Sequence, residues 1–227
     1  MPKLIYLLRR PASVSERELV AGVLDELAPR LLSRDPDGLK VSVSEPGGPR
    51  PWHLPVKHGG LALVAIWSQR DAAEWTAEVA RLGWPLDGYR VSESAPRVHE
   101  RAWPDGERTP GHCMLTLFRK RRALSQAEFV RRWHEGHSPM ALRTHPLVGY
   151  VRNVVEEPLT SGAAPWGGIV EEQLASARDL IDPRRFYGGA LLALPRLLHV
   201  VQQTSTFLHL PSLENHILGE RWLRAPP

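Results

Sequence analysis

Two halves of this chain repeat each other, and that internal repeat constrains the fold more tightly than any other feature. Residues 3–20 align with residues 113–130 at a constant offset of 110, and residues 60–71 align with residues 168–179 at an offset of 108. A repeat of this length indicates two copies of one structural unit. The identical pairs are Leu7/Leu117, Arg9/Arg119, Ser15/Ser125, Glu18/Glu128, Val20/Val130, Pro29/Pro139, Gly60/Gly168, Ser68/Ser176, Arg70/Arg178 and Asp71/Asp179.

Each half opens with a strand and a capped helix. Short apolar runs rich in strand formers predict first strands at residues 3–8 and 113–118. A serine followed three residues later by glutamate forms a capping box in each half, which predicts helices over residues 15–32 and 125–142. Because proline removes a helical hydrogen bond and clashes with the preceding turn, both helices should end or kink at its matched positions.

The remaining pattern completes a βαββαβ unit in each half, the order of a ferredoxin-like fold. A proline and a pair of glycines are expected to interrupt the second helix of the second half. The predicted elements are second strands at residues 39–44 and 149–155, third strands at 61–67 and 169–175, second helices at 71–82 and 179–198, the latter broken at Pro183 and Gly188–Gly189, and fourth strands at 89–94 and 200–210.

A sheet of this kind carries helices on one face only, so its other face must be covered. We therefore expect an α+β protein in which two tandem ferredoxin-like (βαββαβ) repeats close into one eight-stranded barrel, a pseudo-dimeric version of the dimeric α+β barrel. The expected organisation is a degenerate N-terminal repeat at residues 1–95, a proline-rich linker at 96–111, and a C-terminal repeat at 112–227 that holds the presumed site.

Composition excludes several classes of function. The net charge is only +4 and no basic stripe is interleaved with aromatics, so nucleic acid is not an expected partner. The chain has one cysteine, Cys113, and therefore no internal disulfide. The apolar runs are too short for a signal peptide or a membrane span, so we expect a cytoplasmic protein without membrane contact. Nucleotide cofactors lack support because no glycine-rich phosphate loop is present.

The second half resembles a known family. A basic strand end is followed by a serine-capped helix with phenylalanine, tryptophan and histidine, then by a tyrosine–x–x–asparagine strand and a glycine–x–x–glutamate strand. This pattern resembles the EthD family of dimeric α+β barrel proteins, although Val154 stands where that family commonly has histidine. The matching residues are Ser125, Phe129, Trp133, His137, Tyr150, Asn153, Gly168 and Glu171.

The EthD resemblance implies a fold more sharply than a reaction. The family is named from an ether-degradation operon that includes an oxygenase system, and its members are loosely labelled oxidoreductases. Some relatives look like decarboxylases or dehydratases of aromatic polyketides. Family members are usually single domains that dimerise, whereas this chain looks like a covalent fusion of two copies.

His137 is the strongest candidate for chemistry. Helical spacing places it with Phe129 and Trp133 on one apolar face. There it is either a histidine held by the backbone at a helix end, or a neutral proton carrier whose pKa burial has lowered. The repeat favours the second interpretation, because the first half has Val23 and Leu27 at the positions of Trp133 and His137. We therefore expect the main cavity in the second half.

The other candidates lie on strands, where neighbours point to opposite faces. Glu171 and Glu172 therefore cannot share a face, and one buried carboxylate needs a partner, such as Arg119 in a salt bridge, or a raised pKa. Tyr150 and Asn153 also have opposite parity, so not all of these polar residues line one cavity. The predicted catalytic residues are His137 and Glu171, and the predicted substrate-binding residues are Trp133, Tyr150, Asn153, Phe129 and Arg119.

No metal site is expected, because His134 and His137 lack the spacing of a zinc-binding helix. The expected cofactor is none, with haem as an alternative for which His199 and His209 are further candidate ligands.

Two functions remain open. The first is an EthD-like enzyme, a lyase or oxidoreductase, whose cofactor-free acid–base chemistry on an apolar or aromatic carbonyl compound is decarboxylation, dehydration, cyclisation or an oxygenase-linked step. The second is a non-catalytic barrel that binds a hydrophobic ligand or assists an oxygenase or polyketide pathway. An apolar small molecule is the expected partner, and a homodimer is compatible with both.

Overall fold

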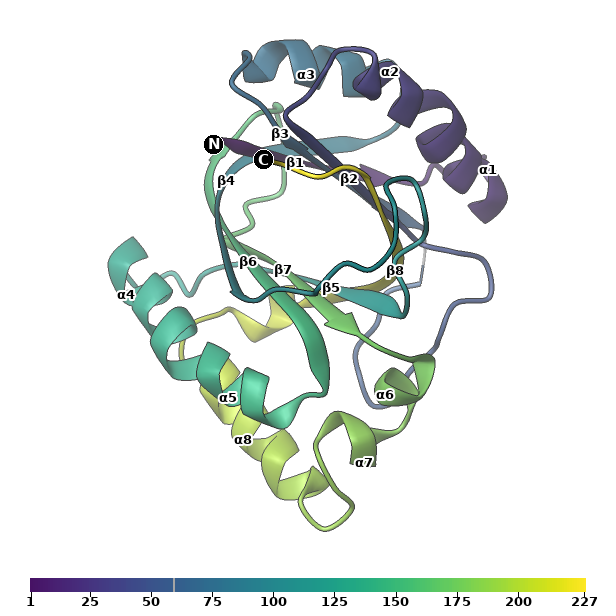
Figure 1. Cartoon of the computed structure of the whole chain (residues 1–227). Coiled ribbons are helices and arrows are strands. Elements are labelled where there is room, and N and C mark those ends of the chain that lie inside the picture. Colours follow the sequence, from purple (N-terminus) through teal and green to yellow (C-terminus); the bar gives the residue numbers. More distant parts are fainter. Residues whose placement is uncertain (59) are drawn as a thin grey trace.

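The computed structural model describes residues 1–58 and 60–227. Within them, strands from both halves close into one barrel in the order β1-β3-β2-β8-β5-β7-β6-β4, and the helices lie outside it (Figure 1). The first half contains β1 (Lys3–Arg9), α1 (Glu16–Ala21), the π-helical η1 (Gly22–Leu27), α2 (Ala28–Leu32), β2 (Gly38–Val43), β3 (Leu61–Trp67), α3 (Ala72–Ala80) and β4 (Leu86–Arg97).

The second half repeats this series with a longer helical segment before its last strand. It contains β5 (His112–Phe118), α4 (Gln126–Arg131), the π-helical η2 (Arg132–His137), α5 (Ser138–Thr144), β6 (Leu147–Pro158), β7 (Gly168–Leu174), α6 (Ala177–Ile181), α7 (Pro183–Phe186), α8 (Ala193–Ser205), the short η3 (Leu210–Ser212) and β8 (Glu214–Arg224).

The two halves close the barrel through equivalent seams. Within each half the first strand lies between the third and fourth, as in a ferredoxin-like sheet. The second strand of each half then pairs with the fourth strand of the other, β2 with β8 and β4 with β6, both antiparallel. The predicted pseudo-dimeric α+β barrel is thereby confirmed.

The first helix of each half carries the same irregularity. The capping box at Ser15 is formed, and Ser125 likewise accepts the backbone N–H of Glu128. Of the two predicted outcomes, an end or a kink, the helices do not end at Pro29 or Pro139. They widen into a π-helical turn just before each proline. The wider turn gives the proline ring room against the carbonyl groups that precede it.

Successive side chains of each strand point to opposite faces of the sheet, and this separates three apolar layers. In β1, Ile5 and Leu7 face the barrel interior, whereas Leu4, Tyr6 and Leu8 pack under the first-half helices. The barrel interior and the second helix layer have cores of their own. The first helix layer is aliphatic around Val23 and Leu27, and the second is aromatic around Trp133.

The predicted fourth strand at residues 200–210 is wrong. α8 continues to Ser205, and the strand is β8, Glu214–Arg224. The β-branched pair Val200–Val201 suggested a strand, but Leu197, Val200 and Thr204 keep one face of a helix toward the core. The predicted breaks are confirmed, because α6, α7 and α8 are separate, with positive φ at Gly188 and Gly189. No helix among the described residues is both long and apolar enough to cross a bilayer.

Residues 1–100 expressed alone should aggregate or self-associate. The isolated sheet would expose Ile5, Leu7 and Leu63, which are fully buried in the closed barrel. Size-exclusion chromatography with light scattering measures this directly. A stable monomer of this fragment would contradict the pseudo-dimeric account.

Candidate functional site

Strand β7 divides the predicted site residues between two faces. Glu171 points into the barrel, where Asn153 Nδ2 donates to its Oε1 at 3.2 Å. Glu172 points the other way and lines a pocket with His137 and Tyr150 under the second-half helices. The expected opposite orientation of the two glutamates, and of Tyr150 and Asn153, is therefore seen. His137 and Glu171, the two predicted catalytic residues, lie on opposite sides of the sheet.

The space under the helices, which we call the outer pocket, has a volume of about 40 Å³. The π-helical segment η2 presents Trp133 and His137 to it from the same side. Trp133 contacts Phe118 edge-on at 4.9 Å between ring centroids and lies parallel to Phe207 at 6.3 Å. Phe129 extends this aromatic cluster but does not line the pocket. The lining residues are Thr116, Phe118, Trp133, His137, Tyr150, Val170, Glu172, Phe207 and Leu208.

A polar contact fixes the geometry of η2. The Ser138 hydroxyl donates to the Trp133 carbonyl at 2.9 Å, and this carbonyl also accepts the backbone N–H of Ser138 in the π-helical turn. Arg152 in turn donates to Ser138 Oγ at 3.1 Å and to the His134 carbonyl at 3.3 Å. The first half has Ala28 at the position of Ser138, so this arrangement belongs to the second half only. It holds the backbone that carries His137.

His137 is a neutral imidazole. Burial, with a smaller contribution from His145, lowers its pKa to about 3. Its ring packs 5.2 Å from that of Phe207, and its buried Nδ1 has no hydrogen-bond partner among the described residues. A histidine that merely stabilised the helix end would use this nitrogen. Within the residues that the structure describes, this nitrogen is unpaired but covered by neighbouring atoms, so it is not held by the helix end.

Glu172 is the titratable carboxyl group of the outer pocket. Burial raises its pKa to about 7, against a weak hydrogen bond from Thr116 Oγ1 at 3.5 Å. No lysine or arginine in the described part of the chain forms an ion pair with it. Tyr150, whose pKa burial raises to about 12, places its hydroxyl 3.4 Å from Ser138 Oγ. The pocket thus combines a neutral base, a carboxyl that titrates near neutrality and a phenol.

The barrel interior holds a network of charges, the interior network, contributed by both halves. Lys40 Nζ lies 2.5 Å from Glu171 and 3.2 Å from Glu220. Lys3 Nζ lies 3.3 Å from Glu171 and 2.7 Å from Glu93, whose side chain is 30% exposed. Apart from Glu93, all members are at least 95% buried. Each lysine comes from the first half, while Glu171 and Glu220 come from the second.

The interior network keeps Glu171 ionised. Burial alone would raise its pKa, but Lys40 and Lys3, with the amide of Asn153, lower it to about 2. The pKa of Lys40 is raised, because its two carboxylate partners outweigh its burial. Glu171 is therefore an anion at neutral pH, paired with two ammonium groups, and this does not favour a proton-carrying role.

Sequence analysis did not identify Lys3 and Lys40 as site residues. The available signal was a lysine at an inward position of the buried strand β2, where only a buried acidic partner makes it tolerable. Glu220 fell outside the predicted strands because the last strand was misplaced. The predicted salt bridge from Glu171 or Glu172 to Arg119 is not formed. Arg119 instead lies over the ring of Trp166, 5.6 Å from the ring centre.

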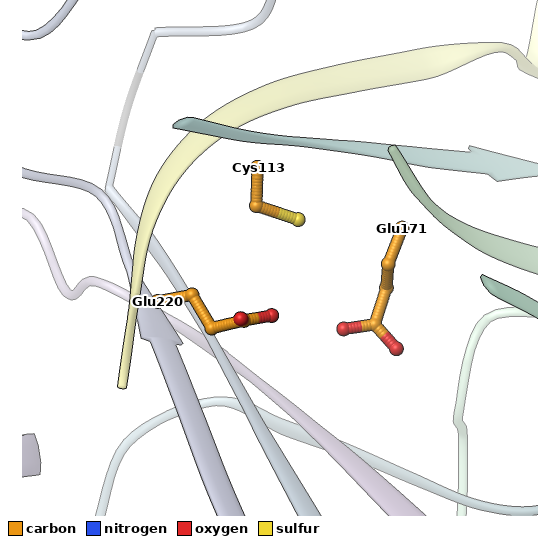
Figure 2. Close-up of side chains that lie close together, drawn as sticks. All are labelled: Cys113, Glu171 and Glu220. Atoms are coloured by element: carbon orange, nitrogen blue, oxygen red, sulfur yellow. The ribbon is translucent and has the colours of Figure 1, made fainter. Parts of the chain in front are cut away.

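The expected main cavity at Trp133 and His137 is also wrong in its location. A cavity of about 290 Å³ opens instead at the end of the barrel, is lined by both halves, and contains neither residue. The interior network forms its floor. Figure 2 shows three side chains of this region, Cys113, Glu171 and Glu220, pointing toward one another inside the barrel. Burial and the two carboxylates raise the pKa of the Cys113 thiol.

Haem does not fit the histidines suggested for it. His199 and His209 are exposed on the surface, and His137 faces a pocket of about 40 Å³, far smaller than the macrocycle requires. The pocket also has Phe207 lying against the imidazole, where an axial ligand would need open space.

Comparison with known proteins supports the fold. No protein-family model matches the chain, and no curated protein matches it in sequence. A solved structure described as an anthrone oxidase-like protein is 10% identical, with a TM-score of 0.62 over 100% of this chain and 94% of its own. A provisionally assigned monooxygenase from Fusobacterium nucleatum is 7% identical, with a TM-score of 0.52 over 98% of this chain and 93% of its own. Both have the dimeric α+β barrel fold.

Glu172→Gln should stabilise the protein, and more at pH 8 than at pH 5. The pKa of Glu172 rises from 4.5 to about 7 on folding, so the folded state retains a proton that the unfolded state loses. The stability that this proton gives the folded state is fully present below pH 4.5 and is lost as the pH rises through 7. The free energy of unfolding falls by up to about 3 kcal/mol over this range. Because glutamine does not titrate, the variant does not lose stability in this way as the pH rises.

Thermal unfolding at the two pH values measures the difference between variant and parent. Glu156→Gln, on an exposed position of the neighbouring strand, is the matched control and should have no pH-dependent effect. An equal change in melting temperature at pH 5 and pH 8 for Glu172→Gln would show that this carboxyl titrates normally.

Proposed function

We propose that the chain is an EthD-like enzyme that carries out acid–base chemistry on an aromatic carbonyl compound in the outer pocket, without an organic cofactor. The observation that carries this proposal is the meeting of His137, Glu172 and Tyr150 in one aromatic-walled pocket. The first half has Leu27, Val64 and Val41 at the equivalent positions, since Val41 pairs with Val64 as Tyr150 pairs with Glu172. A set of polar groups kept in one copy and absent from the other favours a role in function over a role in folding.

The geometry assigns a separate task to each group. Glu172 has a pKa of about 7 and is partly ionised at neutrality, so its carboxylate removes the proton from a carbon acid held against Phe207 and Trp133. His137 has a pKa of about 3 and is the weaker base, so it takes part in the second proton transfer, in which the negative charge on the substrate raises its proton affinity. Tyr150 donates its phenolic hydrogen to the substrate carbonyl and stabilises the enolate oxygen.

The volume of the outer pocket sets a condition on this chemistry. About 40 Å³ admits only a few water molecules. Phe207 and Leu208, in the turn that follows α8, form the outer wall. An aromatic substrate therefore requires this wall to open, and the turn is held by hydrogen bonds from Arg121 to the Phe207 carbonyl and from Arg132 to the Thr206 carbonyl.

Two of the similar structures suggest an oxidative outcome, because they are described as anthrone oxidase-like and as a provisional monooxygenase. An anthrone has an acidic ring CH₂ opposite its carbonyl. Loss of one proton gives an aromatic enolate, which O₂ oxidises to the anthraquinone with release of water. The protein's part in this reaction is the proton removal and the stabilisation of the enolate, which are the steps that His137, Glu172 and Tyr150 supply.

His137→Ala and Glu172→Gln should each lower kcat/KM for aerobic conversion of anthrone by about a hundredfold or more, the usual contribution of a general acid or base. Product formation by chromatography and O₂ uptake in an electrode measure the loss. His134→Ala is the matched control, since His134 lies on the same helix but does not line the outer pocket, and its activity should stay within about twofold.

Melting temperatures separate a catalytic effect from a structural one. Because His137 Nδ1 has no partner to lose, His137→Ala should lower the melting temperature by only a few degrees. Full turnover in His137→Ala would rule out its proposed role. Binding of anthrone without conversion, in the parent as in the variants, would instead indicate a non-catalytic ligand-binding barrel.

A further inference from the structure

The cavity at the end of the barrel lies on the opposite side of β7 from the outer pocket and is not used by the proposed chemistry. It has a volume of about 290 Å³. Strand ends of both halves surround it, and its rim is formed by His99 and Arg101 from the chain between β4 and β5 and by Pro226 near the C-terminus. This connecting chain is fixed to β8, because the backbone N–H groups of Gly106 and Thr109 donate to β8 carbonyls at 2.7 Å.

One wall of the cavity is aromatic and rigidly held. Trp67 and Trp222 stack with 5.3 Å between ring centroids and an angle of 23° between their planes. Lys3 lies 4.6 Å from the ring centre of Trp67, and Lys40 lies 5.0 Å from that of Trp222. The indole N–H of Trp222 donates to Glu220 at 3.2 Å. The network thus orients a flat surface on which a planar molecule can stack.

The floor of the cavity has no unused positive charge. Lys3 pairs with Glu93 and Glu171, and Lys40 pairs with Glu171 and Glu220, so two ammonium groups face three carboxylates. An anionic ligand would therefore meet carboxylates whose countercharges are already engaged. A neutral or cationic ligand meets no such repulsion.

At the rim, the charge of Arg101 is also engaged, because Arg101 pairs with Asp105 at 2.5 Å. Its guanidinium lies over the ring of Trp222, 5.8 Å from the ring centre, so it covers part of the aromatic wall. The buried Nε of Arg101 has no partner among the described residues and can donate to a neutral acceptor.

Gln173 supplies the polar selectivity. Its Nε2 donates to Glu220 at 2.7 Å, and only the amide nitrogen can donate to a carboxylate, so the orientation of the amide is fixed. Its Oε1 then lacks a donor in the described structure, although the side chain is 95% buried and lines the cavity. A buried acceptor of this kind requires an N–H or O–H from the occupant.

The arrangement in Figure 2 could also suggest a metal. The ligand atoms of Cys113, Glu171 and Glu220 all lie within 4.8 Å of one another. Lys40 already occupies this position, however, with its ammonium in contact with both carboxylates. A divalent cation would have to displace a buried, paired ammonium and deprotonate a buried thiol. The cavity beside the network is the more favourable site.

We propose that the barrel-end cavity binds an uncharged mono- or bicyclic aromatic compound bearing a hydroxyl or amino group, which stacks on Trp222 and donates to Gln173 Oε1. This site is independent of the proposed chemistry in the outer pocket.

Isothermal titration of the full chain with 2-naphthol, 2-naphthoate and naphthalene tests the proposal. 2-Naphthol should bind at least about tenfold more tightly than 2-naphthoate. Gln173→Leu should weaken the binding of 2-naphthol by about two- to tenfold, the value of one hydrogen bond, and leave the affinity for naphthalene unchanged. Val151→Trp, which fills the cavity from β6, should abolish binding of all three compounds, whereas His137→Ala should not affect it.

Several results would overturn this proposal. One is binding of 2-naphthoate as tight as that of 2-naphthol, or no binding of 2-naphthol at all. Another is loss of binding in His137→Ala, which would place the ligand in the outer pocket. Zn²⁺ binding that Cys113→Ser removes, and that competes with 2-naphthol, would assign the cavity to a metal. If Val151→Trp does not fold, the comparison of 2-naphthol with naphthalene in Gln173→Leu decides alone.

Discussion

The contact between Lys40 and Glu171 is the interaction on which the rest of this structure depends. It joins a strand of the first half to a strand of the second across the barrel interior, at 2.5 Å and with both side chains almost fully buried. Either charge left alone there would destabilise the fold severely, whereas together, with Lys3 and Glu220, they are compatible with a closed interior. The charges thereby specify how two similar half-barrels face each other, which apolar packing alone specifies weakly.

The same repeat explains why the two helix layers differ. Both halves keep the capped helix, the π-helical turn and the following proline, because these features shape the backbone. At the positions where the first half has Val23 and Leu27, the second half has Trp133 and His137. At these positions the first layer is apolar. The other retains an imidazole and a buried carboxyl group, both of which reduce stability and are the groups to which we assign the proposed chemistry.

Sequence predicted the barrel because its signals are local and occur twice. Capping boxes, strand periodicity and matched prolines each act within a few residues. It also predicted that Glu171 and Glu172 face opposite sides, since parity follows from strand geometry. It could not choose which glutamate joins His137, because that depends on the sheet's position relative to the helices. Nor could it pair Lys40 with Glu171, which are 131 residues apart and meet only when the barrel closes.

A double-mutant cycle between Lys40 and Glu171 tests the central claim most directly. Lys40→Met and Glu171→Gln, singly and together, are compared by urea unfolding. Each single change removes the shortest contact of a buried charge and leaves it one charged partner, Lys3 for Glu171 or Glu220 for Lys40, so it should lower the free energy of unfolding by up to roughly 3–5 kcal/mol. The double variant should lose much less than the sum, giving a coupling energy of about 2 kcal/mol or more. Additive losses, within about 0.5 kcal/mol, would show that the two halves do not depend on this pair.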